Sequence, residues 1–308
     1  MKKLIALSLT MMLSISLTAC GSSDDSKKQS DQSVSAGDDT GADSSASNDT
    51  DTANDDTPEN SDDGQSSGDA ASADSDSAYV KGKGSLVVGI TNFEPMDYKD
   101  ADGNWVGFDA DMAKAFAESL GVTAEFVEID WDNKIFELDG KTIDCVWNGM
   151  TLTDEVTSSM ECSKAYCNNA QVVIVHADQA ELYQDVESLK ELNFAVEAGS
   201  AGEAQAKSNN FSYTPVQQQS AALMEVAAGT ADAAIIDSLM AAAMVGEGTG
   251  YADLTYTVGL NSEEYGVGFR KGSDLANALN EFFASAYADG SMMECAETYG
   301  VQAAVVKQ

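Results

Sequence analysis

Between residues 85 and 151, short apolar runs alternate with helix-like stretches, and this alternation limits the possible folds more than any other feature. Ser85–Ile90 is an apolar run of strand length, residues 122–129 alternate as a strand does, and residues 142–147 form a third run. Between the first two, apolar side chains recur every fourth residue at Phe108, Met112, Phe116 and Leu120, which predicts one buried helix face. A strand–helix order of this kind predicts a parallel sheet with helices on its faces.

The second half of the chain continues in the same way, so the whole folded part is predicted to be of the α/β class. Strands are expected at 170–175, from 194, at 232–237 and at 265–270. Helices are expected at 186–192, 202–208, 220–228, 238–245, 275–288 and 290–299.

Residues 147–156 are the stretch most suggestive of a binding site. A strand that ends at Gly149 is followed by the hydroxyl residues Thr151 and Thr153 and then by two acids, as at the start of a helix. Free backbone N–H groups and hydroxyls at such a corner bind anions, carboxylates especially. Thr-Leu-Thr-Asp-Glu is equally an ordinary helix N-cap.

The N-terminus has the pattern of a secretory signal. Two lysines precede an apolar run from Leu4 to Leu17, which is too short to remain as a membrane span. The sequence Leu-Thr-Ala-Cys-Gly around Cys20 resembles a bacterial lipobox. We therefore expect a signal peptide over residues 1–20, and a mature chain held at the extracytoplasmic face of the cell membrane by a lipid, such as palmitate, on Cys20. The alternative is a plain secreted protein.

Residues 21–80 are rich in Ser, Asp, Ala and Gly and nearly devoid of large apolar side chains. With 16 acidic residues against two lysines, this stretch repels itself and cannot bury enough apolar surface to offset the entropy of folding. It is predicted to be a disordered tether, with an acidic tail that binds a ligand as the alternative. The net charge of −36 for the whole chain argues against nucleic acid as a partner.

Four cysteines lie beyond the tether, and a disulfide between Cys162 and Cys167 is the first expectation for an extracytoplasmic protein. The single histidine, His176, is remote from any cysteine cluster with zinc-like spacing, so we expect no metal site and a structural role for it. No cofactor is expected.

The order of short motifs resembles one family throughout residues 85–300. These motifs are Leu86–Ile90 with Phe93 and Pro95, residues 106–113, Asp130-Trp131, residues 149–155, residues 196–202, residues 231–237, residues 265–273 and Asp289-Gly-Ser. They resemble the polar amino acid family of periplasmic-type solute-binding proteins, family 3, which are the capture subunits of ABC importers.

The resemblance implies a two-lobe periplasmic-binding-protein-like fold (type II), with two hinge strands and a ligand held in the interlobe cleft. Lobe one would comprise residues 85–172 plus 260–308, and lobe two residues 173–259. It also implies a monomer whose partners are a small ligand and the subunits of an ABC permease.

The same resemblance assigns roles to individual side chains. Phe93 and Trp131 would wall the ligand, Asn148, Gly149 and Thr151 would hold its carboxylate with Ser200 and Ala201, and Asp237 would pair with its ammonium. Each has a structural alternative: the aromatics as core residues, Thr151 as a cap, and Asp237 as the N-cap of the next helix.

One position departs from the family pattern. Val156 stands where members usually have an arginine that pairs with the ligand carboxylate, and this loss costs roughly 1.5–3 kcal/mol of binding free energy. Glu94, Glu197 and Asp237 are expected to make the pocket acidic, so we hypothesise a cationic or amine ligand. Compensation by another cation, for example Lys164, is the alternative; a basic residue within hydrogen-bond reach of the Thr151 loop would contradict the hypothesis.

Three functions remain after these arguments. The first is a lipid-anchored binding protein that captures an amino acid or related amine for an ABC importer. The second is a ligand-sensing receptor subunit of the same fold, which would need a separate signalling partner. The third is a dehydratase-type enzyme, which would need a placed general acid or base; we expect a protein without enzymatic activity.

Overall fold

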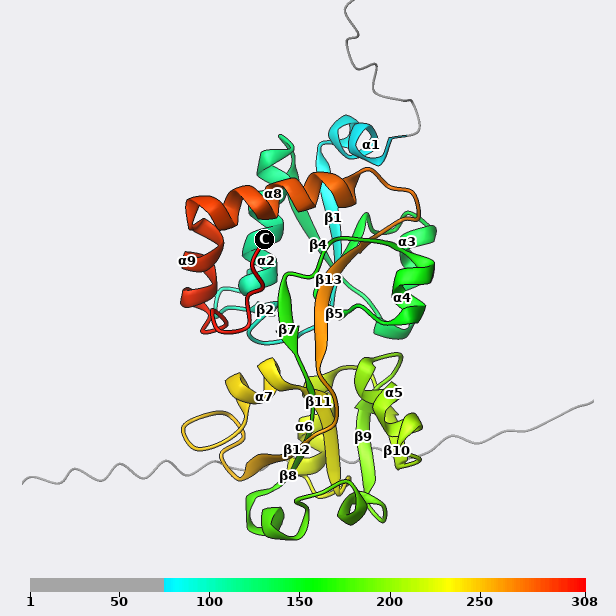
Figure 1. The fold of residues 1–308 in the computed structure, drawn as a ribbon, viewed down its shortest axis with the longest axis vertical. Coiled ribbons are helices and arrows are strands. Elements are labelled where there is room, and N and C mark those ends of the chain that lie inside the picture. The colour runs from blue at the N-terminus through cyan, green and yellow to red at the C-terminus, as the bar shows by residue number, and fades with distance from the viewer. Residues whose placement is uncertain (1–74) are drawn as a thin grey trace, which may run out of the picture. The chain divides into compact units, whose positions relative to one another are not determined.

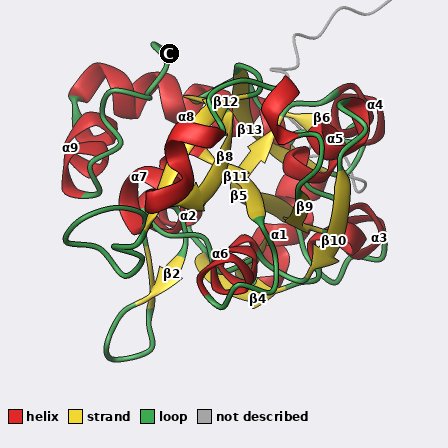
Figure 2. Ribbon diagram, turned by 90° about the horizontal axis from the view of Figure 1, so that it is seen from below, coloured by secondary structure: helices red, strands yellow, loops and turns green. Residues whose placement is uncertain are grey.

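The computed structural model describes residues 75–308. The expected signal peptide with Cys20, and the tether up to residue 74, lie outside the described residues. Two β-sheets with helices packed around them form two α/β lobes (Figures 1 and 2). The predicted two-lobe α/β fold is therefore confirmed.

The first lobe is built on a sheet with the strand order β4-β1-β5-β13-β6, in which β7 also pairs with β13. Strands β4, β1 and β5 are mutually parallel, and β13 runs antiparallel to β5. The strands of this lobe are β1 (Ser85–Ile90), β4 (Thr123–Glu128), β5 (Cys145–Thr151), β6 (Glu161–Cys162), β7 (Cys167–Asn169) and β13 (Glu263–Phe269), with a separate hairpin of β2 (Tyr98–Lys99) and β3 (Trp105–Val106). Its helices are α1 (Asp76–Lys83), α2 (Phe108–Ser119), α3 (Lys134–Asp139), α4 (Asp154–Ser159), α8 (Leu275–Asp289) and α9 (Ser291–Thr298), with a 3-10 turn η1 (Trp131–Asn133).

The second lobe is built on a sheet with the order β10-β9-β11-β8-β12. Here β10, β9 and β11 are parallel, whereas β8 is antiparallel to both β11 and β12. Its strands are β8 (Gln171–His176), β9 (Asn193–Glu197), β10 (Ser212–Val216), β11 (Ala233–Asp237) and β12 (Leu254–Gly259). Its helices are α5 (Ala201–Ser208), α6 (Gln219–Ala227) and α7 (Ser238–Met244), with 3-10 turns η2 (Ala177–Leu182) and η3 (Glu187–Leu189).

The chain passes between the lobes twice, from β7 into β8 at Ala170 and from β12 into β13 over residues 260–262. Gln171 already pairs with Asp237 of the second sheet, so the first boundary lies about two residues earlier than expected. The helix expected at 186–192 is only the short turn η3.

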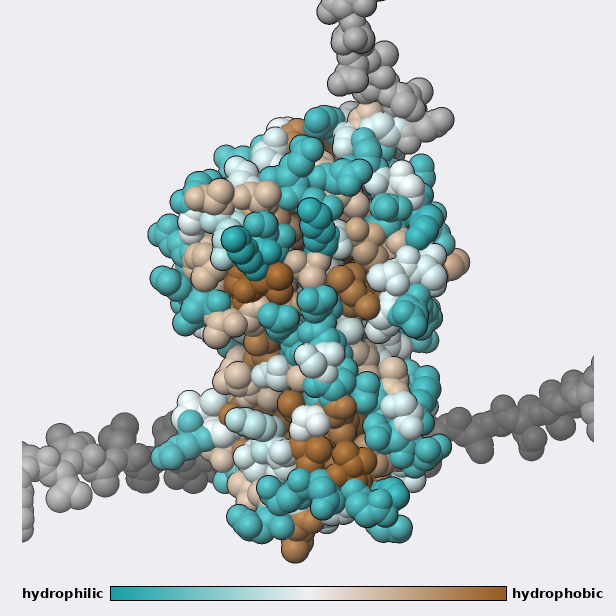
Figure 3. Space-filling model, in the orientation of Figure 1, coloured by the Kyte–Doolittle hydropathy of each residue, from teal (hydrophilic) through white to brown (hydrophobic). Residues whose placement is uncertain are grey.

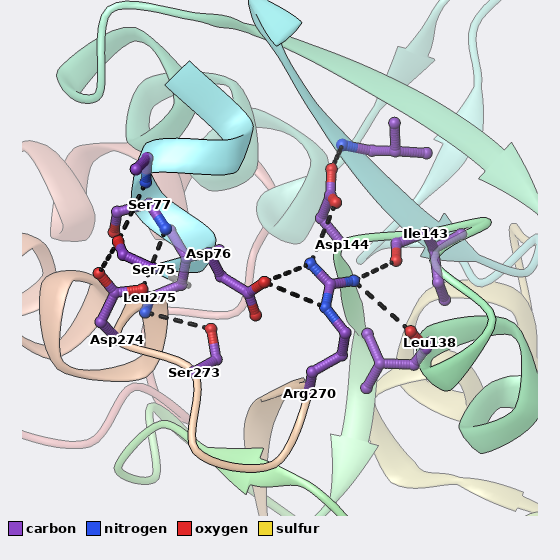
Figure 4. Close-up of polar contacts among 12 residues, drawn as sticks. Ser75, Asp76, Ser77, Leu138, Ile143, Asp144, Arg270, Ser273, Asp274 and Leu275 are labelled. Carbon is purple, nitrogen blue, oxygen red and sulfur yellow. Dashed lines mark hydrogen bonds and ion pairs between the residues drawn. The ribbon is translucent and has the colours of Figure 1, made fainter. Parts of the chain in front are cut away.

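The predicted end of the disordered tether, residue 80, is wrong, because helix α1 occupies residues 76–83. Arg270, after β13, reaches Asp76 of α1 at 3.0 Å and Asp144 at 3.4 Å, and also donates to the Ile143 carbonyl (Figure 4). Ser75 caps the helix and donates to Asp274 at 2.6 Å. These partners lie up to 199 residues away in sequence, which is why composition alone did not reveal the helix.

The core of lobe one is aromatic. Trp147 of β5 packs at 5.5 Å from Phe283 of α8 and at 6.3 Å from Phe116 of α2, measured between ring centroids. Phe108, Met112 and Phe116 are buried along one face of α2, as their spacing predicted. Figure 3 shows apolar side chains scattered among polar ones on one face of both lobes, which is normal for a protein surface.

The predicted disulfide is wrong: Cys162 and Cys167 are free thiols, as are Cys145 and Cys295. Cys162 on β6 pairs with Gly268 of β13, and Cys167 on β7 pairs with Tyr265 of the same strand. The two cysteines therefore lie opposite positions of β13 that are three residues apart.

Within residues 75–308 no helix is long and apolar enough to cross a membrane, and no group of His, Cys, Asp and Glu side chains is arranged to hold a metal ion. His176 ends β8 and contacts the Val226 carbonyl at 2.9 Å.

Candidate functional site

A cavity of about 220 Å³ lies between the lobes and takes lining residues from both. On the lobe-one side these come from η1, α3, the end of β5 and the start of α4. On the lobe-two side they come from the end of β9, the start of α5, α6 and the end of β11. The lining residues are Trp131, Lys134, Asn148, Gly149, Met150, Thr151, Thr153, Asp154, Glu155, Val156, Glu197, Gly199, Ser200, Ala201, Ala204, Gln219 and Asp237.

The end of β5 does line the cavity, but its polar groups are already bonded within the protein. The Gly149 N–H donates to Asp109 Oδ2 at 2.7 Å, and the Thr151 hydroxyl donates to Glu263 at 2.9 Å. The Asn148 side-chain amide donates to Asp97 at 2.8 Å and accepts from Thr91. The Gly149 N–H and the Asn148 amide are thus occupied by partners within the protein, and the expected role of this segment in holding a ligand carboxylate stays a prediction.

Two buried carboxyls behind β5 explain this. Asp109, the second residue of α2, is fully buried and also accepts from the Tyr166 hydroxyl at 2.6 Å. Burial raises its pKa to about 7, while the hydrogen bonds from Tyr166 and Gly149 oppose the rise. Burial and the charge of Asp109 also raise the pKa of Asp97. No sequence pattern predicted this buried pair, because acids are common in the first turn of a helix, where they interact favourably with the helix dipole.

The Thr-Leu-Thr-Asp-Glu segment is a helix N-cap, which was one of its two readings. The Thr153 hydroxyl accepts from the Val156 N–H at 3.2 Å and so begins helix α4. Val156 lines the cavity and is buried. An apolar side chain thus stands in the cavity at the position of the family arginine.

The two aromatic side chains expected to contact the ligand, Trp131 and Phe93, lie in different surroundings in the structure. Trp131 lines the cavity. Phe93 packs edge-on against Tyr265 at 6.4 Å and against Gly149, and within residues 75–308 the cavity lining includes neither Phe93 nor Glu94. Phe93 is buried at this position, and the roles expected of Phe93 and Glu94 beside a ligand stay predictions.

Lys134 is the charged residue among several cavity residues, such as Gln219 and Ala204, that the sequence did not predict for the site. It is 8% exposed, and its ammonium donates to the carbonyls of Trp131 at 3.2 Å and Gly199 at 2.9 Å. Burial lowers its pKa, while Glu155 and Glu197 oppose the fall. The sequence feature that could have indicated Lys134 is its position three residues after Trp131.

Lys164, the suggested compensating cation, lies outside the cavity lining of the described chain. Its backbone N–H donates to the Asn280 side chain.

The lobe-two wall is formed where β9 turns into α5. Ser200 is the N-cap of α5, and its hydroxyl accepts from the Glu203 N–H at 3.1 Å. Ala201 is the first residue of that helix and also lines the cavity. Glu197 is the last residue of β9, is 2% exposed, and has a side-chain oxygen, Oε1, without a hydrogen-bond partner among the described residues.

Asp237 lies at the end of β11 and is held by donors from several elements. Its carboxylate accepts from Gln171 at 2.9 Å and from the Tyr265 hydroxyl at 2.7 Å, and also from Asn169 and Gln219. Burial first, and then the nearby charge of Glu263, raise its pKa to about 7. Asp237 is also the N-cap residue of α7, as the structural alternative predicted, but its side chain makes no capping hydrogen bond to that helix.

The lobes contact one another across the cleft. Besides the Lys134 bond to Gly199, Gln217 donates to Asp130 and Gln218 donates to Glu128, both at 2.7 Å. The Gly199 backbone lies so close to Asp132 that a β-carbon at position 199 would be 2.7 Å from Asp132 Cα. The structure is therefore a closed arrangement of the two lobes.

The comparisons with known proteins agree on one protein family. Residues 86–302 match the sequence profile of the bacterial extracellular solute-binding proteins, family 3. The chain is 27% identical over 229 residues to the L-cystine-binding protein TcyJ of Escherichia coli (strain K12), covering 71% of this chain and 84% of that protein. It is 30% identical over 216 residues to the arginine-binding extracellular protein ArtP of Bacillus subtilis (strain 168), covering 67% and 82%.

Solved structures share the fold. A substrate-binding protein of an ABC uptake transporter from Streptococcus pneumoniae, with bound histidine, has a TM-score of 0.70 and 30% identity, covering 76% of this chain and 99% of that one. An ancestral amino acid-binding protein, described as a precursor of cyclohexadienyl dehydratase, has a TM-score of 0.67 and 31% identity, covering 73% and 99%.

Proposed function

The chain belongs to family 3 of the bacterial extracellular solute-binding proteins, and from this premise we propose that it captures an amino acid or related amine between its lobes and delivers it to the permease of an ABC importer. The observation that carries the proposal is a cavity walled by both lobes, which are joined by two crossings of the chain. Closure around a ligand at such a site couples binding to a change of shape, which a permease can recognise.

The size of the cavity supports a small ligand. Sites for drug-sized molecules have volumes of roughly 300–1,000 Å³. The cavity here is about 220 Å³, which suits a molecule the size of an amino acid.

The charges around the cavity support a ligand with a positive group. Four carboxyl residues line it, namely Asp154, Glu155, Glu197 and Asp237, against the single ammonium of Lys134. Lys134 bonds to carbonyls of Trp131 and Gly199, and no bond from it to the Thr151 loop is present among the described residues. The hypothesis of a cationic ligand therefore stays open, with Lys134 as the group available to an anionic end.

We propose binding rather than turnover. The relatives compared above are named for binding amino acids, and the cavity needs no chemistry to retain a ligand.

We also propose that the protein is a monomer anchored to the extracytoplasmic face of the cell membrane through a lipid on Cys20. Incorporation of labelled palmitate into the wild type but not into Cys20→Ser is the expected result, and equal labelling would refute the anchor.

Calorimetric titration of the full-length protein, purified in detergent, tests ligand capture. The panel is arginine, lysine, histidine, glutamine, cystine and agmatine, which is arginine without its carboxylate. Ala204→Phe places a ring in the cavity and should abolish binding, whereas Ala227→Phe, at an exposed site on α6, should not. No binding by any member of the panel, or undiminished binding by Ala204→Phe, would contradict the proposal.

A further inference from the structure

Glu197 has an unsatisfied oxygen in the interlobe cavity. Within residues 75–308, five buried side-chain polar atoms lack a hydrogen-bond partner, and Glu197 Oε1 is the one whose residue lines the cavity. Buried polar atoms without a partner are rare in folded proteins, because each retains the cost of its lost hydration.

The backbone around Glu197 is held by bonds to neighbouring elements. Glu197 ends β9 and pairs with Val216 of β10, and its carbonyl accepts from the Ser200 N–H in the turn before α5. Since Glu197 lines the cavity, a ligand held there can supply the missing donor to Oε1.

The neighbouring acid, Asp237, differs in this respect. Its carboxylate already accepts from Asn169, Gln171, Gln219 and the Tyr265 hydroxyl. Of the two buried acids that face the cavity, only Glu197 keeps a buried acceptor without a donor in the described chain.

We propose that Glu197 determines specificity by binding the positively charged group of the ligand, and that the ligand is a basic amino acid. This inference rests on the proposed function and narrows it to one class of ligand. The charged group is an ammonium or a guanidinium, because both donate hydrogen bonds to a carboxylate and carry the opposite charge.

Lys134 explains why the ligand is a basic amino acid rather than a diamine. An ammonium has three N–H donors, and two of those on Lys134 go to the carbonyls of Trp131 and Gly199. No ion pair within 4.0 Å joins Lys134 to Glu197 in the described chain. Among the carboxyl groups that line the cavity, that of Glu197 therefore has a buried oxygen without a donor and is not paired with Lys134, and we match Lys134 to the carboxylate and Glu197 to the cationic side chain of one ligand.

The protonation of Glu197 gives the binding reaction a measurable signature. Burial raises its pKa to about 8, with Asp237 adding to the rise and Lys134 and Gln219 opposing it. At pH 7 the free carboxyl therefore keeps its proton, and a bound cation favours its release.

Arginine and citrulline form a matched pair of ligands, since they have nearly the same shape but citrulline is neutral. Titration of the full-length protein in detergent should give roughly 10–150-fold tighter binding of arginine, from the strength of a charged hydrogen bond. Glu197→Gln should reduce this ratio to about threefold or less. The control Glu181→Gln removes an exposed acid of the same lobe and should leave the ratio unchanged.

A measurement on the wild type covers the case in which Glu197→Gln does not fold. Titration at pH 7 in two buffers with different ionisation enthalpies should show release of a proton with arginine but not with citrulline. Equal affinity for both ligands, a ratio that survives Glu197→Gln, or no difference in proton release would overturn this inference and leave the proposed function standing. No binding of any amino acid in the panel would overturn both.

Discussion

Gly199 is predicted to be required for closure of the lobes rather than for the stability of its own lobe. It has a φ of +69°, and a β-carbon there would lie 2.7 Å from both Cα and Oδ1 of Asp132, which belongs to the opposite lobe. The Cα belongs to the backbone and cannot swing away as a side chain does. Gly199→Ala should therefore hold the lobes apart.

The expected magnitude follows from two separate costs. The left-handed backbone conformation costs an alanine roughly 1–2 kcal/mol of folding free energy. Steric overpacking costs roughly 1–3 kcal/mol more, but only when the lobes are closed. This second cost should weaken ligand binding about 5- to 150-fold.

Gly229→Ala is the matched control. Gly229 lies in the same lobe with a φ of +71°, and a β-carbon there would meet nothing within 4 Å. Both variants should lose similar stability in urea unfolding, but only Gly199→Ala should lose affinity in calorimetric titration with the tightest ligand of the panel. Equal affinity of the two variants would show that binding does not require this closed contact, and would refute the reasoning.

Three further predictions concern stability. Arg270→Met leaves Asp76 without its cation, whereas Asp144 keeps its ion pair with Lys83, and the change should cost roughly 1–3 kcal/mol in urea unfolding; a loss below about 1 kcal/mol would contradict the role given to this cluster. Thr153→Ala removes the N-cap of α4 and should cost about 1 kcal/mol in the same assay, where an unchanged midpoint would be the contrary result. Burial raises the pKa of Glu197 from 4.5 to about 8, so the folded protein holds a proton that the unfolded chain releases, and this group lowers stability as pH rises between those values. Relative to the wild type, Glu197→Gln should therefore gain stability across that range, and a difference independent of pH would show that the carboxyl is not buried in this way.

Local sequence patterns predicted the helices and strands well because the formation of these elements depends on residues that are neighbours in the chain. The four-residue repeat from Phe108 to Phe116 predicted the buried face of α2, and Thr153 predicted a helix start two residues after the end of β5. The motif order predicted the family and the place of Trp131 and Val156 beside the cavity. Helix α1 was missed because its first residues, Asp76, Ser77 and Ala78, are of the same types as those of the preceding stretch, and because it is held by Arg270, which is 194 residues away.

The state of each polar group was decided by tertiary contacts. Gly149 lines the cavity, but its N–H donates to Asp109, 40 residues earlier in the chain. Asp237 also lines the cavity, but its carboxylate is occupied by donors on other strands and on α6. Glu197 is left with a free oxygen for the opposite reason, since no donor of the described chain reaches it.

The sequence by itself determined the two-lobe α/β fold, the family and the segments that surround the cavity, because apolar periodicity and turn residues act over a few positions. Only the tertiary structure decided which groups in that cavity remain available to a ligand. A hydrogen-bonding group pairs with whichever donor or acceptor the fold places near it. Whether such a partner is present in the described chain depends on elements that are distant in sequence, as it does for Gly149, Lys134, Glu197 and Asp237.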